Sequence, residues 1–138
     1  MRIGFGDEFI AIDEFDPDAY FQADSGSVNV SVQVKLKEFS GIYHSVSITQ
    51  PEIQHFIGEL ERLEKTRQGE IVLSSFCPNE FFLTIRSRGQ HKRLVVEVGL
   101  SRFQYIGSVE WNTGISGGFE LDEGAIPSIV NSFKTLIQ

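Results

Sequence analysis

The sequence predicts an α+β fold: an antiparallel sheet of about six or seven strands, with two helices packed on one of its faces. Apolar and polar residues alternate with a period of two at 28–36, which is typical of a strand with one buried face. Apolar residues then recur every three or four positions in two later stretches, so we expect helices at about 50–67 and 123–137. Burying both apolar stripes against the sheet would form one core, and residues 1–138 are the right length for a single domain.

The first half of the chain carries the clearest strand signals. Residues 28–36 alternate most regularly, and Ser40-Gly41 predicts a turn into a second, antiparallel strand that spans 39–48. Residues 9–13 alternate as well, and Asp16-Pro17-Asp18 ends whatever strand they form.

The first helix has a clear start. Thr49 can cap it with its hydroxyl, Glu52 stands where a capping box needs an acid, and Pro51 suits the first turn. Gln68-Gly69 is expected to end the helix. Five apolar residues form its buried stripe: Ile53, Phe56, Ile57, Leu60 and Leu63.

A second group of strands is predicted at 70–76, 80–88, 91–100 and 104–112, with turn residues between them. Residues 113–118 are rich in Gly and Ser and are interpreted as a loop. Phe103, Tyr105 and Trp111 could face a groove, but a role in the core or on a sheet face is the preferred interpretation. Asp122 is a plausible cap for the last helix.

The residues that usually carry catalysis or bind metals form no recognisable pattern. His44, His55 and His91 fall in three different elements, and Cys77 is the only cysteine, so the spacings of zinc sites are missing. No glycine-rich phosphate loop is present. We therefore expect no cofactor, no metal and no enzyme activity. The acidic start of the chain and the single cysteine favour a cytoplasmic protein.

Charge is distributed unevenly along the chain. The formal net charge is -7, which argues against binding to nucleic acid or to an anionic membrane, because both need clustered Lys and Arg. The first 24 residues hold seven acids and one base, whereas the other 114 hold 12 acids and 11 bases. This segment would suit a basic protein partner, with carboxylates that speed the encounter and aromatic anchors that supply contact area. The candidate partner-binding residues are Asp13, Glu14, Phe15, Asp16, Asp18 and Tyr20.

Other interpretations of the acidic segment remain open. It could be a solvated stretch that only aids solubility. It could also hold Ca²⁺, although residues 13–18 lack the glycine and the terminal glutamate of an EF-hand loop.

The order and spacing of the elements from 28 to 136 resemble those of the WapI immunity proteins and related uncharacterised bacterial families. The similar features are the strand at 28–36, the glycine-led strand at 69–73, the paired strands at 81–85 and 94–100, the closing helix, and the motif Ile53-xx-Phe56-xxx-Leu60-xx-Leu63. The resemblance implies a cytoplasmic protein that binds and neutralises a cognate toxin, commonly a nuclease. It carries over no functional residue.

The resulting hypothesis is a non-catalytic domain that blocks a basic toxin by covering it. The alternative is a domain that binds a small molecule in a pocket between the sheet and the helices, near Trp111 and the loop at 113–118.

Overall fold

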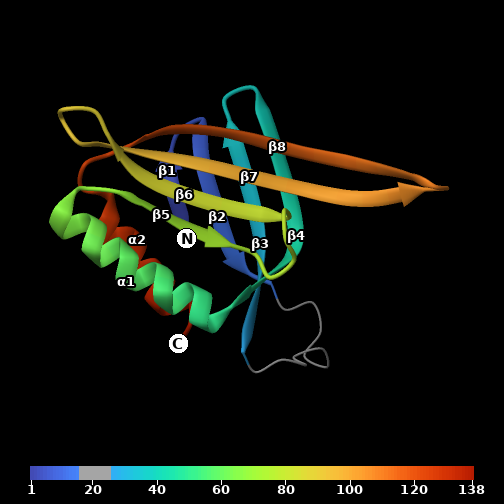
Figure 1. The fold of residues 1–138 in the computed structure, drawn as a ribbon, viewed down its shortest axis with the longest axis horizontal. Helices are drawn as coiled ribbons and strands as arrows, with labels where there is room; N and C mark the ends of the chain where they lie inside the picture. The colour runs from blue at the N-terminus through green and yellow to red at the C-terminus, as the bar shows by residue number, and fades with distance from the viewer. Residues whose placement is uncertain (16–25) are drawn as a thin grey trace.

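The computed structural model describes residues 1–15 and 26–138 and contains eight strands in two antiparallel sheets (Figure 1). The first sheet has the order β1-β2-β3-β4 and the second has the order β5-β6-β7-β8. The strands of the first sheet are β1 (Arg2–Phe5), β2 (Glu8–Glu14), β3 (Ser27–Leu36) and β4 (Phe39–Thr49). Those of the second are β5 (Glu70–Ser74), β6 (Phe81–Arg88), β7 (Arg93–Ile106) and β8 (Val109–Leu121).

The α+β class is confirmed, but the prediction of one sheet with six or seven strands is wrong. Every strand pairs with its neighbour in the chain, as sequential strands usually do. The exception is at helix α1 (Gln50–Thr66), which separates β4 from β5, so that a new sheet begins after it. Period-two alternation shows which side of a strand is buried, but it does not show which strands share a sheet.

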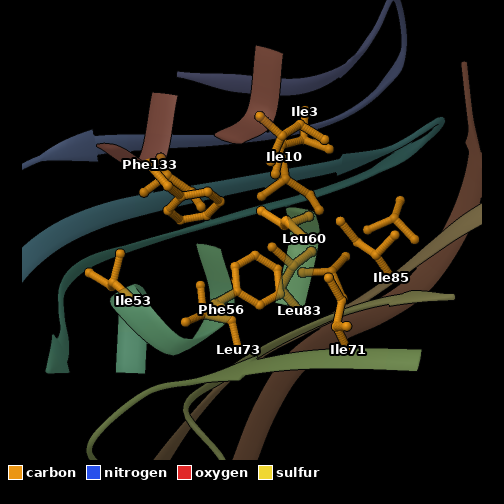
Figure 2. Packing of buried hydrophobic residues seen from close by; sticks show 14 of the residues in the cluster. Ile3, Ile10, Ile53, Phe56, Leu60, Ile71, Leu73, Leu83, Ile85 and Phe133 are labelled. Carbon is orange, nitrogen blue, oxygen red and sulfur yellow. The ribbon is translucent and has the colours of Figure 1, made fainter. Parts of the chain in front are cut away.

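The two sheets and two helices enclose one apolar core. Helix α1 packs along β5 and against helix α2 (Ala125–Leu136), which in turn reaches β1. The sheets contact each other directly where β8 meets β3 and β4, and the helices close the core at the edges formed by β1 and β5 rather than covering one face of a single sheet. Figure 2 shows side chains from all these layers meeting: Ile3, Ile10, Phe56, Ile71, Leu83 and Phe133.

The predicted helices are confirmed with small changes at their ends. The Glu52 amide donates to the Thr49 hydroxyl over 3.3 Å, and all five residues of the predicted stripe are buried. Helix α1 ends at Thr66, because Arg67 adopts the left-handed conformation (φ 52°) before Gln68-Gly69 is reached. The prediction of Asp122 as the cap of the last helix is wrong: Gly124 caps α2 and no side chain forms a capping bond, while Asp122 accepts the Gly124 amide over 3.2 Å.

Strands β7 and β8 form one long hairpin, whereas the sequence analysis predicted separate strands at 91–100 and 104–112 followed by a loop at 113–118. Their register runs without a shift from the Leu94–Leu121 pair to the Ile106–Val109 pair. Residues 101–103 and 113–118, which were not predicted as strand, belong to it, because in a paired ribbon the cross-strand hydrogen bonds outweigh the low strand propensity of Gly and Ser. The pairing of β6 with β7 ends at Leu100, so residues 101–114 continue as a two-stranded ribbon that projects from the body (Figure 1). We call residues 101–114 the arm.

Within the described residues, no helix is long and apolar enough to cross a membrane.

Candidate functional site

The arm exposes an unusual amount of apolar surface. The exposed fractions are 40% for Phe103, 71% for Tyr105, 58% for Ile106 and 54% for both Val109 and Trp111. These are five of the ten large apolar side chains that are exposed in the described part of the chain. Large aromatic side chains in water are typical of surfaces that bind another protein.

The apolar residues lie on both faces of the arm. Residues paired across an antiparallel ladder share a face, and successive residues alternate between faces. Trp111 pairs with Gln104 and therefore lies on the face that continues from buried Leu100. Phe103 and Tyr105 lie on the opposite, outer face. A partner could therefore contact the arm from either side.

A cleft of about 730 Å³ separates the base of the arm from strand β4. Ile42, Tyr43 and His44 line one wall, and Arg102, Gln104 and Thr113 are among the residues that line the other. The sequence placed a possible pocket near residues 113–118, and residues 113–115 do line this cleft. Its second wall, however, is a strand of the first sheet and not a helix, because the helices fill the far side of the core.

Tyr43 holds the two sheets together at the cleft. Its hydroxyl donates to Glu80 Oε1 over 3.2 Å. Burial raises the pKa of Tyr43 above its ordinary value of 10.0, and the negative charge of Glu80 adds to that effect. The phenol therefore stays protonated at neutral pH and serves as a hydrogen-bond donor, which is a structural role.

The residues predicted to bind the partner lie in part at the end of strand β2. Asp13 and Glu14 are exposed there, and Asp13 Oδ1 lies 3.3 Å from the N-terminal ammonium of Met1. The ring of Phe15 is half-buried, with its centroid 5.6 Å from that of His44. Asp16, Asp18 and Tyr20 lie outside the described residues.

His44 connects this strand end with the cleft. Its Nδ1 atom is 3.0 Å from the Ser31 hydroxyl, and it also lines the cleft. The structure thus places Phe15 against His44, and His44 lines the same cleft as residues at the base of the arm.

In residues 1–15 and 26–138, no group of three or more His, Cys, Asp or Glu residues lies close enough together to hold a metal ion. Cys77 is exposed.

Comparison with protein-family models matches residues 8–138 to the family described as the immunity protein WapI-like family. The chain belongs to this family. The match covers nearly the whole chain and confirms the resemblance seen in the sequence. For this WapI-like protein, comparison with curated proteins and with solved structures gave no match.

The arm is the feature that the sequence interpretation missed. Phe103, Tyr105 and Trp111 were interpreted mainly as core or sheet-face residues; they do occupy sheet faces, but on a ribbon where, among the described residues, they remain exposed. A two-residue turn at Gly107-Ser108, flanked by Ile106 and Val109, is the signal that could have revealed the hairpin.

Proposed function

We propose that this protein binds a cognate toxin in the cytoplasm and blocks it by covering it, without performing any chemistry. Membership of the WapI-like immunity family supports this role. The observation that carries the proposal further is the arm. An isolated two-stranded ribbon is marginally stable in water, and one that exposes five large apolar side chains gains stability when another protein covers it.

The partner that best fits this surface is basic, as many nucleases are. The chain carries a net charge of -7, and its first 24 residues account for -6 of it, from seven acids and one base. In this proposal the acids Asp13, Glu14, Asp16 and Asp18 attract the toxin, and Phe15 and Tyr20 anchor it. Asp13 and Glu14 are exposed, as this role requires.

The test uses the candidate toxin domain that this protein captures in a pull-down identified by mass spectrometry, rendered inactive by mutation. Replacing the four acids with Asn or Gln should slow association and reduce its dependence on salt, because long-range attraction acts mainly on the encounter rate. A control variant removes the same number of exposed charges outside the first 24 residues, at Glu38, Glu61, Asp122 and Glu123. Stopped-flow measurements at two salt concentrations compare the variants. Equal rates for both would show that the N-terminal acids are not the contact site.

A second candidate function is supported by the cleft beside β4. Its volume of about 730 Å³ falls within the usual range for small-molecule sites, and it combines apolar Ile42 with the polar groups of Tyr43 and Arg102. A thermal-shift screen with metabolites separates the two functions. Stabilisation that disappears in Arg102→Ala would favour the small-molecule function.

A further inference from the structure

The free edge of strand β8 differs from the other three sheet edges. Proteins usually protect edge strands by keeping them short, by bulges, or by Lys and Pro residues. Strand β1 has four residues and β5 has five, and each lies against a helix. Strand β4 has a bulge beside Ser45 (φ 72°), and its Ser47 carbonyl already accepts the Phe76 amide. Strand β8 has 13 residues with no bulge, no Lys and no Pro.

The turn at the tip of the arm determines which main-chain groups of β8 face outward. Gly107 has a φ of 65°, and Ile106 pairs with Val109, as in a two-residue type II′ hairpin. The pair that flanks such a turn is hydrogen bonded, and bonded pairs then alternate with non-bonded pairs along the ladder. Six residues of β8 therefore direct their amide and carbonyl groups away from β7: Glu110, Asn112, Gly114, Ser116, Gly118 and Glu120.

A hydrogen bond on the other side of the hairpin supports this assignment. Ser101 is the partner of Gly114, and its amide donates to the Glu80 carbonyl over 2.8 Å, on the side away from β8. By symmetry, Gly114 faces the opposite side. Among the described residues, no hydrogen bond joins the outward groups of β8 to another element, so the edge is open for pairing. Figure 1 shows β8 on the outer side of the second sheet.

Charge decides which partner suits this edge. Strand β8 contains Glu110 and Glu120 and no basic residue. Pairing with a second copy would bring together two acidic strands and two bodies of charge -7, which is unfavourable. A strand with Lys or Arg opposite Glu110 would form favourable cross-strand pairs instead.

From these observations we infer that an extended, basic strand of the toxin adds to the free edge of β8 and becomes the fifth strand of the second sheet. This inference rests on the proposed function and identifies how the partner is held. The added strand forms main-chain hydrogen bonds with Asn112, Gly114 and Ser116. The side chain of Trp111, the residue before Asn112, packs over the side chains of the added strand.

Proline substitutions test this inference, because proline removes an outward amide while leaving the β7–β8 ladder intact. Asn112→Pro and Ser116→Pro are each expected to weaken binding of the inactive toxin domain by about tenfold or more, since each removes one main-chain bond and its ring obstructs the edge. Asn112→Ala and Ser116→Ala keep the amide and should bind within about twofold of the unchanged protein. Tyr105→Pro, compared with Tyr105→Ala, tests the open edge of β7 in the same way and should show no additional loss. Circular dichroism checks that each variant is folded.

Hydrogen exchange gives a readout that needs no variant. In the complex, the amides of Asn112, Gly114 and Ser116 should become protected, which main-chain pairing produces and contacts through side chains alone do not. The inference would be overturned, but not the proposed function, if folded proline variants bound the toxin as tightly as the unchanged protein. It would also be overturned if the toxin did not slow hydrogen exchange at these amides. Absence of binding by the unchanged protein would overturn the proposed function and this inference with it. A self-dimer that the prolines disrupt while toxin binding is unaffected would assign the edge to a second copy instead.

Discussion

Replacing Trp111 with Ala should separate partner binding from folding. Trp111 is 54% exposed, and a large aromatic side chain covers about 150–250 Å², so about 80–135 Å² of Trp111 remains for a partner to bury. At about 25 cal/mol per Å², complete coverage contributes about 2–3 kcal/mol, or about 30- to 150-fold in Kd. The free protein loses little stability in this variant, because the arm lies outside the apolar core.

Titration calorimetry with the inactive toxin domain measures the loss. The matched control is Phe5→Ala, which removes an aromatic side chain that is 81% exposed at the far edge of the first sheet. Because Trp111 is the only tryptophan, 5-fluorotryptophan labelling yields one ¹⁹F signal, which should shift when the toxin binds. A Trp111→Ala variant that binds within twofold of the unchanged protein, together with a ¹⁹F signal that does not move, would refute a role for the arm in binding.

Three further predictions concern the fold. Phe56→Ala should reduce the free energy of unfolding by about 3–5 kcal/mol in urea titrations, because Phe56 is buried between the sheets. Gly99→Ala should reduce it by about 1–3 kcal/mol, since a Cβ at Gly99 would collide with the ring of Phe82, and pairing it with Phe82→Leu should recover part of the loss. Tyr43→Phe should lose about 1 kcal/mol at pH 8 with its bond to Glu80. Because the pKa of Tyr43 is raised in the folded protein, the protonated phenol contributes its full stability below pH 10.0, and this contribution is lost as the pH rises through the pKa of the folded state. The difference in unfolding free energy between Tyr43→Phe and the unchanged protein should therefore narrow in alkaline urea titrations. A difference that stays constant from pH 8 to pH 11 would contradict this assignment.

Local patterns in the sequence were sufficient to predict most of the elements. The period-two alternation at 28–36 and the cap at Thr49 correspond to β3 and α1, because both depend on residues that are close together in the chain. The division into two sheets was not predictable in this way, since it depends on which strands pair across the α1 connection. The β7–β8 hairpin was missed because Gly114, Gly117 and Gly118 suggest a loop when their cross-strand partners are not known.

The candidate site shows the same limit. Asp13 and Glu14 could be recognised from the sequence because charge is visible residue by residue, and both are exposed as expected. Whether they contact a partner remains a prediction. The exposure of Tyr105 and Trp111 depends on where β6 stops pairing with β7, which no local pattern reveals.

The independence of the arm from the core also has an evolutionary consequence. Substitutions along the exposed positions 102–113 alter the surface offered to a partner while leaving the buried cluster untouched. Under the proposed function, a lineage can follow a diverging toxin by changing this ribbon alone, and related proteins should differ most in the arm while retaining the same scaffold beneath it.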